Sequence, residues 1–187
     1  IRPHFLFNSL NAVLSLIRAE PKRAEHALEE LAELFRALMR DNRELVPIAD
    51  EIALCRQYLD LEKLRLGERL HVEWEIDDIP TDLKIPPLML QPLLENAVYH
   101  GIEPSGETGT LSIRFKRSAD ELLIDLANPC TGAAAPGGNR MALANIRERL
   151  ALYYDLEARM ETQEVSLDNG RREYRVRIAL PCRGAKS

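Results

Sequence analysis

The spacing of apolar residues changes at Gly67, and this change limits the folds that the chain can adopt. Before Gly67, apolar side chains recur at steps of three and four residues, which is the period of an α-helix. After it, runs such as LHVEWEI and ELLIDLAN alternate apolar and polar residues, as β-strands do. The sequence therefore predicts an α+β chain, with helices over residues 1–66 and a mixed domain over residues 67–187.

The first part is predicted to contain three helices, over residues 4–19, 21–40 and 50–66. Pro21 suits the first turn of the second helix, Asp50 is a predicted N-cap and Gly67 a predicted stop. The first two helices would form an antiparallel hairpin. The apolar seam of its first helix consists of Phe7, Leu10, Leu14 and Ile17. Because a lone hairpin leaves such a stripe uncovered, we expect two chains to complete a four-helix bundle.

The second part is predicted to mix strands and helices. Strands are expected at residues 70–76, 110–115, 121–128, 158–165 and 173–180. Helices are expected at residues 85–101, entered through prolines, and at residues 141–154, after a loop rich in glycine and proline at residues 130–139. This order favours an α/β sandwich, with the helices on one face of a mixed sheet.

Charge and composition narrow the possible functions. The formal net charge of −5 argues against a broad nucleic-acid-binding face, which needs basic side chains to displace counterions. Cys55, Cys130 and Cys182 lack the spacing of a zinc site, and we expect reduced thiols. No run of about 18 apolar residues is present, as a membrane-spanning helix would need. The chain begins without methionine inside a helical pattern, so we expect a piece of a longer protein whose membrane or sensor part lies upstream.

A polar pair stands at the edge of the apolar seam. His4 and Asn8 are four residues apart, so they share one face of the first helix. A histidine in such a position is more often a hydrogen-bonded and silent member of a helical seam than a reactive group. From the pair alone, both interpretations stay open.

A second polar group interrupts the predicted helix at residues 85–101. Glu95 and Asn96 lie among apolar residues, and His100 and Gly101 follow at the end of the helix. Buried polar groups need partners. This group is therefore either a satisfied helix terminus or a site for a metal-phosphate ligand.

Three blocks resemble, in order and spacing, the signatures of the LytS/YehU-type sensor histidine kinases: RPHFLFNSLN, PPLMLQPLLENAVYHGI and ANIRERL. The resemblance covers essentially the whole chain. It implies a dimerisation and histidine-phosphotransfer hairpin over residues 1–66 and an ATP-binding domain of the Bergerat (GHKL) type over residues 67–187. The implied partners are a second copy of the chain and a response regulator, and the implied location is the cytoplasmic portion of an inner-membrane protein.

The resemblance also implies roles for individual residues. His4 would be the phosphoacceptor, whose ring nitrogen attacks the γ-phosphorus of ATP before a response-regulator aspartate takes the phosphoryl group. An imidazole suits this role because it is largely neutral near pH 7. Asn8 would orient a water that dephosphorylates the regulator, and Asn96 would coordinate Mg²⁺, a hard cation that takes oxygen ligands beside phosphates. The implied nucleotide contacts are Glu95, Asn96, His100, Gly101, Asn128, Gly137, Gly138, Arg140 and Asn145.

Four positions depart from the pattern of the family. Asn128 stands where many ATPases of this type have an aspartate that accepts a hydrogen bond from the adenine amino group. Arg140 and Ala142 stand where glycines often let phosphates approach the following helix. Tyr99 replaces a lysine that contacts phosphate in many kinases. Arg147 and Arg149 could replace that cation, but they are expected to form the solvated face of the helix.

Two functions therefore remain open. The first is an active kinase core that phosphorylates His4 with ATP. The second is a degenerate kinase with weak or no ATP binding, which docks a response regulator and acts on it through Asn8 or by sequestration. An ATPase clamp of the gyrase or chaperone type shares the nucleotide fold. It is less favoured, because it needs no phosphoacceptor hairpin and the acidic chain offers no track for DNA.

Overall fold

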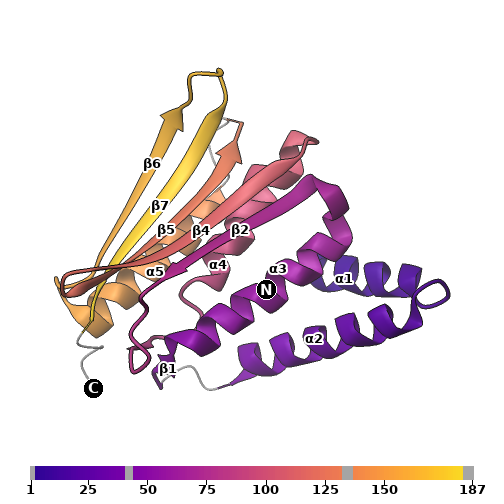
Figure 1. The fold of residues 1–187 in the computed structure, drawn as a ribbon, viewed down its shortest axis with the longest axis horizontal. Coiled ribbons are helices and arrows are strands. Elements are labelled where there is room, and N and C mark those ends of the chain that lie inside the picture. The colour runs from indigo at the N-terminus through magenta and orange to yellow at the C-terminus, as the bar shows by residue number, and fades with distance from the viewer. Residues whose placement is uncertain (1–2, 41–43, 132–136, 183–187) are drawn as a thin grey trace.

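Three helices precede the sheet: α1 (Pro3–Leu16), α2 (Pro21–Met39) and α3 (Ile48–Leu66). The structure, a computed structural model, describes residues 3–40, 44–131 and 137–182 (Figure 1). α1 and α2 lie side by side as the predicted hairpin, and α3 packs against both of them. The apolar side chains buried in these helices include Phe5, Val13, Ala27, Leu31, Leu34 and Tyr58.

The boundaries of these helices differ from the prediction at two points. α1 ends at Leu16, three residues before the predicted end, because the chain turns there toward α2. α3 begins at Ile48 with Pro47 at its N-cap, so the prediction that Asp50 is the cap is wrong. Asp50 lies instead in the first turn, where a negative charge favours the helix N-terminus. Gly67 ends α3 as predicted, with a φ of +58° that glycine adopts easily.

Five strands form the sheet, in the order β2, β4, β5, β7, β6 (Figure 1). Their bounds are β2 (Leu70–Asp77), β4 (Gly109–Ser118), β5 (Glu121–Cys130), β6 (Arg159–Ser166) and β7 (Arg172–Pro181). β2 and β4 are parallel, and the other neighbours are antiparallel. All five predicted strands are therefore confirmed. Alternation along β5 puts these residues on its buried face: Leu122, Ile124, Leu126 and Asn128.

Two further helices cover one face of this sheet, α4 (Gln91–Asn96) and α5 (Gly137–Tyr154) (Figure 1). α4 continues into the π-helical turn η2 (Ala97–Ile102) and the 3₁₀ turn η3 (Glu103–Ser105), while η1 (Gly67–Arg69) joins α3 to β2. The predicted helix at residues 85–101 is wrong in its first part. There β3 (Lys84–Ile85) pairs with β1 (Val46–Pro47), and the prolines that follow disfavour a helix.

The predicted α+β architecture is confirmed as a helical part joined to an α/β sandwich. The core of the sandwich lies between the sheet and the helices. Its buried side chains include Leu94, Leu111, Ile113, Phe115, Ile146 and Leu150. α3 contacts both the hairpin and α4, so it links the two parts. Among the described residues, no helix is both long and apolar enough to cross a lipid bilayer.

The predicted seam of α1 faces away from the other helices. Its members Phe7, Leu10, Leu14 and Ile17 expose 63, 37, 63 and 49 % of their surface. Phe5 and Val13 are the apolar residues of α1 that are buried in the core. The described residues of a single chain thus leave this stripe largely uncovered, and we call it the α1 stripe.

The edge strand β2 is marked by acidic side chains. Glu73, Glu75 and Asp77 are exposed along it, and Arg114 of β4 contacts Glu75 with 2.7 Å between Nε and Oε2. Among the strands of the described residues, β2 pairs with β4 alone, so its other side is the open edge of the sheet. The acidic residues therefore lie along an unpaired strand edge.

Candidate nucleotide and phosphotransfer site

The helix formed by α4 and η2 carries the polar residues predicted to hold the nucleotide. Asn96 is buried, with 7 % of its surface exposed, and its Nδ2 has no hydrogen-bond partner among the described residues. Glu95 is half-buried, and Gln91 donates from Nε2 to its Oε2 at 3.3 Å. A buried amide nitrogen without an acceptor is costly. The surroundings of Asn96 therefore fit a site that an external group completes.

The end of β5 approaches this helix at Gly101. A Cβ at Gly101 would lie 2.2 Å from Asn128 Nδ2 and 2.6 Å from the carbonyl oxygen of Pro129, so only glycine fits. Asn128 is 5 % exposed and donates from Nδ2 to that oxygen of Pro129 at 2.8 Å, which leaves its Oδ1 as an acceptor. Asn128 therefore lies close to the helix that carries Asn96.

The glycines predicted to lie beside phosphates open helix α5. The helix begins at Gly137 and Gly138, four residues before its predicted start. Its N-terminus offers backbone N–H groups of the kind that bind phosphate. Arg140 and Asn145 are exposed on the same helix. Residues 132–136 of the predicted loop lie outside the described residues.

His4 lies at the start of α1, beside a small pocket between α1, α3 and the α4–η2 helix. The residues that line it are His4, Phe5, Asn8, Tyr58, Glu62, Arg65, Glu95, Val98, Tyr99 and Glu103. His4 is exposed and Asn8 is half-buried. Phe5 packs on Tyr58 with 5.2 Å between the ring centroids, which fixes this end of α1 against α3. The structure thus brings His4 and Asn8 next to Glu95 and Tyr99, and we call this the His4 pocket.

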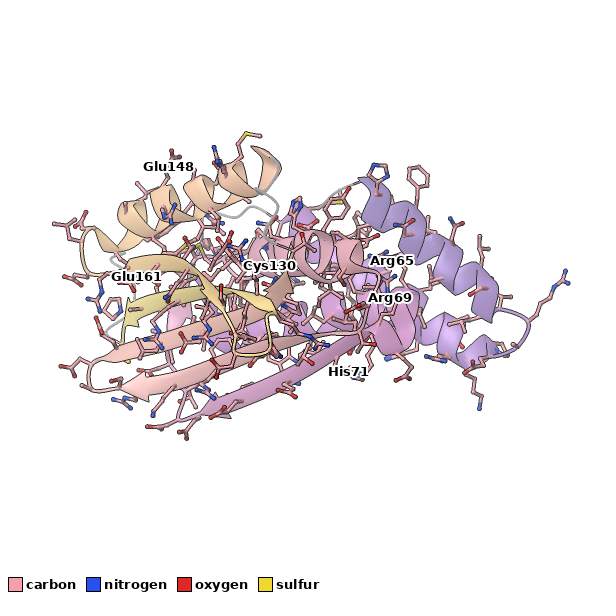
Figure 2. All side chains as sticks on the ribbon, turned by 90° about the horizontal axis from the view of Figure 1, so that it is seen from above. Arg65, Arg69, His71, Cys130, Glu148 and Glu161 are labelled. Carbon is pink, nitrogen blue, oxygen red and sulfur yellow. The ribbon has the colours of Figure 1, made fainter. Side chains whose placement is uncertain are left out.

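An ion-pair network borders the His4 pocket. Arg65 contacts Glu103 with 2.9 Å between Nη1 and Oε1, and it contacts Glu62 with 2.5 Å between Nη2 and Oε2. Arg69 donates to the carbonyl oxygen of Glu103 at 2.9 Å. Figure 2 shows both arginines where the helical part meets the sheet. Burial raises the pKa of the Glu62 carboxyl, and the charge of Arg65 opposes part of that rise.

The turn that precedes α4 is held from two sides. The Glu51 carboxylate of α3 accepts the N–H of Leu88 through Oε2 and the N–H of Leu90 through Oε1, both at 2.9 Å. Arg149 of α5 donates to the carbonyl oxygen of Pro87 at 2.6 Å and to that of Leu88 at 3.3 Å. The prediction that Arg149 is only a solvated side chain is therefore wrong.

Sequence reasoning also missed Glu51, although its position carried a signal. Glu51 lies on the buried side of α3, near Ile48 and Cys55 in the helical repeat. An acidic residue at a core-facing position of a helix indicates a buried partner. Arg149 carried no comparable signal, because arginines in amphipathic helices are usually exposed.

The donor set around Asn96 suits a hard cation that also binds phosphate. Among the described residues, no group of three or more His, Cys, Asp or Glu side chains is arranged to hold a metal ion. The Oδ1 of Asn96 is the atom that suits Mg²⁺, because this ion takes oxygen ligands, keeps waters and needs few protein ligands beside phosphates. The Nδ2 of Asn96 is a hydrogen-bond donor and would face a phosphate oxygen or water instead. Cys55, Cys130 and Cys182 are free thiols, as predicted.

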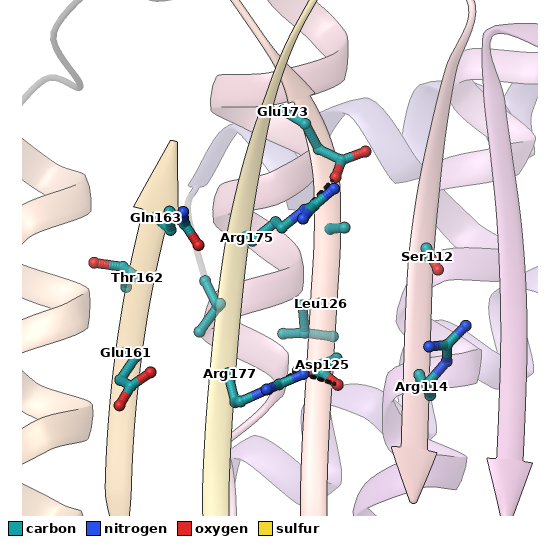
Figure 3. Close-up of a pocket in the computed structure, with 12 residues that line it drawn as sticks. Ser112, Arg114, Asp125, Leu126, Glu161, Thr162, Gln163, Glu173, Arg175 and Arg177 are labelled. Atoms are coloured by element: carbon teal, nitrogen blue, oxygen red, sulfur yellow. Dashed lines mark hydrogen bonds and ion pairs between the residues drawn. The ribbon is translucent and has the colours of Figure 1, made fainter. Parts of the chain in front are cut away.

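The outer face of the sheet carries a broad groove that is separate from this site (Figure 3). Its polar lining includes Ser112, Arg114, Asp125, Glu161, Gln163, Glu173, Arg175 and Arg177. Arg177 pairs with Asp125 across neighbouring strands at 2.6 Å, and Arg175 pairs with Glu173 at 2.5 Å. Because opposite charges neutralise each other here, this face suits a nucleotide less well than the site that contains the buried side chains of Asn96 and Asn128.

Comparison with known proteins adds three findings. Residues 1–70 match the family described as Histidine kinase. The chain is 30 % identical to the sensor protein LytS of Oceanobacillus iheyensis, over all of this chain and 34 % of that protein. It is also 30 % identical to the sensor histidine kinase BtsS of Escherichia coli K12, over 98 % of this chain and 32 % of that protein. The chain thus spans about a third of the length of these relatives.

Among solved structures, the histidine kinase AdeS of Acinetobacter baumannii resembles the chain in fold. The match covers 90 % of this chain and 83 % of that chain, with a TM-score of 0.54 and 13 % sequence identity. At this identity the likeness concerns the arrangement of helices and strands.

Proposed function

Because the chain belongs to the LytS-type family of sensor histidine kinases, we propose that it is the kinase core of a two-component system. In this proposal the chain transfers the γ-phosphoryl group of ATP to His4, and an aspartate of a response regulator then receives it. Residues 1–66 hold the phosphoacceptor and the dimerisation surface, and residues 67–187 bind ATP.

The buried side chain of Asn96, whose Nδ2 has no hydrogen-bond partner among the described residues, is the observation that carries this proposal. It lies in the helix that also borders the His4 pocket through Glu95 and Tyr99. An α-helix with its side chains is about 10 Å across. In this proposal the nucleotide site and the phosphoacceptor would therefore border the same helix.

The residues of the site take distinct roles in this proposal. A ring nitrogen of His4 attacks the γ-phosphorus, the bond from that phosphorus to its bridging oxygen breaks, and ADP leaves. Asn96 would hold Mg²⁺, which neutralises phosphate charge when it is bound. The Oδ1 of Asn128 would accept a hydrogen bond from the adenine amino group. The backbone N–H groups at Gly137 and Gly138 would face the phosphates.

The working unit in this proposal is a homodimer. The α1 stripe is apolar and exposed, so pairing two hairpins through it would bury the stripe in a four-helix bundle. A response regulator would dock where His4 is exposed, and Asn8 would orient the water that dephosphorylates it. The chain would act as the cytoplasmic portion of a longer, membrane-bound sensor.

A degenerate kinase that acts by binding is the second candidate. Tyr99 stands where many kinases have a lysine, and it packs edge-on against His100 with 5.1 Å between the ring centroids. A tyrosine supplies no positive charge to the phosphates, and Asn128 supplies no negative charge to the adenine amino group. In this case His4 and Asn8 would serve a regulator that is phosphorylated elsewhere.

Calorimetric titration with Mg-ATP, together with transfer of labelled γ-phosphate, separates the two candidates. An active kinase binds Mg-ATP and gains an acid-labile label, which His4→Gln abolishes, while Asn96→Ala abolishes binding. His71→Gln is the matched control, because His71 is exposed on β2, and it should retain both properties. Label that persists in His4→Gln would overturn the phosphoacceptor assignment. A chain that binds no Mg-ATP but dephosphorylates a regulator, and loses this with Asn8→Ala, would establish the second candidate.

A further inference from the structure

The turn between β3 and α4 lacks the local support of an ordinary helix start. Leu90 occupies the N-cap position of α4, and its side chain cannot accept hydrogen bonds from the first N–H groups. Pro86 and Pro87 have no N–H groups to contribute. Leu88 has a φ of +56°, in the left-handed region that residues other than glycine rarely adopt. Such a conformation persists only where the surrounding structure holds it.

Glu51 supplies the missing cap from another helix. Its carboxylate accepts the N–H groups of Leu88 and Leu90, which lie 37 and 39 positions later in the chain. Glu51 is 2 % exposed, so these bonds are shielded from water. An anion at this end of α4 also interacts favourably with the helix dipole. The start of the helix that carries Asn96 is therefore fixed by α3.

Arg149 holds the carbonyl side of the same turn. It donates from Nη2 to Pro87 and from Nη1 to Leu88, so its planar guanidinium spans two consecutive carbonyl groups. Arg149 belongs to α5, whose N-terminus carries the glycines assigned to the phosphates. The turn therefore connects α3 to both helices that would bind the triphosphate end of ATP.

We propose that Glu51 and Arg149 are positioning residues for the nucleotide site, and that the turn they hold transmits the position of the helical part to Asn96. The proposal rests on the proposed function, because it says how the ATP site is aligned. A movement of α3 relative to the sheet shifts the start of α4, and with it Asn96 relative to the N-terminus of α5. Asn128 lies on β5 beside Gly101, toward the other end of the α4–η2 helix. We therefore expect the adenine contact to depend less on this turn than Asn96 does.

This difference between Asn96 and Asn128 gives a test that a merely structural role would not pass. ATP affinity is measured by calorimetry on the whole chain, once with Mg²⁺ and once with EDTA. Glu51→Gln keeps the shape of the side chain but turns one accepting oxygen into a donor that faces a backbone N–H. We expect Mg-ATP affinity to fall about tenfold or more, while the affinity for ATP in EDTA stays within about twofold.

Two further variants make the result independent of one substitution. Glu51→Asp keeps the carboxylate, and we expect it to recover part of the Mg²⁺-dependent affinity that Glu51→Gln loses. Arg149→Lys keeps the charge but cannot span two carbonyl groups in one plane, and we expect it to lose Mg²⁺-dependent affinity as well. If Glu51→Gln does not fold, Arg149→Lys decides the question alone.

The matched controls lie on the exposed side of α5. Glu148→Gln and Arg147→Lys should leave both affinities unchanged (Figure 2 shows Glu148 on the outer side of the helix). An equal loss of ATP affinity with and without Mg²⁺, accompanied by a lower melting temperature, would show that Glu51 and Arg149 have only a structural role. That result would overturn the proposal. If the variants bind like the controls, this inference fails alone. If the unsubstituted chain binds no ATP in either condition, the proposed function fails first and the inference falls with it.

Discussion

Asn128 and Pro129 form a matched pair at the end of β5. The amide of Asn128 donates to the carbonyl oxygen of Pro129 at 2.8 Å, a bond that the aspartate of the family pattern cannot make. An ionised carboxylate in the same buried place would face that carbonyl oxygen instead. The asparagine is therefore tied to its own neighbour, and restoring the aspartate would not by itself restore the pattern.

Asn128→Asp is accordingly expected to weaken the fold. The lost hydrogen bond and the opposed oxygens should lower the free energy of unfolding by about 1–3 kcal/mol, which urea denaturation would measure. Mg-ATP affinity should not improve, as calorimetry would show. Asn169→Asp is the matched control, because Asn169 Oδ1 accepts the N–H of Arg171 at 3.0 Å in an exposed turn and an aspartate accepts equally well. Unchanged stability together with tighter ATP binding would contradict this account.

The predictability of single residues follows how local their signal is. The helix or strand face of His4, Asn8, Asn96 and Asn128 could be predicted, because each lies in a short block whose spacing or alternation defines that face, while their roles are proposals that rest on the family resemblance. The interaction of Arg149 depends on carbonyl groups about 60 positions earlier, so no local sequence pattern could predict it. Hydrogen-bond partners that are distant in the sequence are determined only when the helices and strands pack together.

Helix α3 is attached to the α4–η2 helix at both ends. Glu51 and Glu62 are both buried and are separated by about three helical turns, so they lie on one face of α3. Glu51 binds the turn that begins α4, whereas Glu62 is joined through Arg65 to Glu103 at the far end. This double attachment makes α3 the element that sets the place of the candidate nucleotide helix.

Removing one ion of the second attachment should destabilise the fold in a pH-dependent way. Arg65→Met leaves the buried Glu62 carboxylate without its main cation, which we expect to cost about 3–5 kcal/mol near pH 8. Burial raises the pKa of Glu62 in the folded state above its unfolded value, and loss of Arg65 raises that pKa further. Stability is therefore lost as pH rises through the folded-state pKa and is regained as pH falls toward the unfolded value.

Thermal unfolding of Arg65→Met at pH 5 and pH 8 checks this expectation. The control is Arg114→Met, which removes an exposed partner of Glu75 and should change the free energy of unfolding by about 0–1 kcal/mol at either pH. A loss of the same size at both pH values would show that the charge of Glu62 is not the cause.

The elements themselves were predicted unevenly, for physical reasons. The five long strands alternate over several residues, which is a signal within the strand itself. The β1–β3 pair was missed because each strand has two residues, too few to show a period. The late start of α4 was missed because the turn before it is stabilised by Glu51 and Arg149, which lie outside the segment.

For the whole molecule, the α1 stripe predicts the oligomeric state. Leu14→Glu places a charge at a position that is 63 % exposed in one chain but would be buried in a four-helix bundle. Burying a leucine contributes about 1.5–3 kcal/mol, and a dimer loses two such contacts, so the dimer should dissociate about a hundredfold more readily or more. Sedimentation equilibrium measures this change.

The control for that measurement is Leu152→Glu on α5, because Leu152 is 78 % exposed and lies outside the hairpin. It should sediment like the unsubstituted chain. A dimer that survives Leu14→Glu, or an unsubstituted chain that is monomeric at high concentration, would contradict the proposed bundle.

The acidic edge of the sheet has a consequence for how copies of this chain can meet. An open strand edge offers unpaired N–H and C=O groups to another strand, and such contacts lead toward aggregates. Two copies that approached through β2 would bring Glu73, Glu75 and Asp77 against their own counterparts, and like charges would repel. Edge-to-edge pairing of the sheets of two copies is thereby disfavoured. Self-association is then directed toward the helical part, and the sheets of the two copies remain separate.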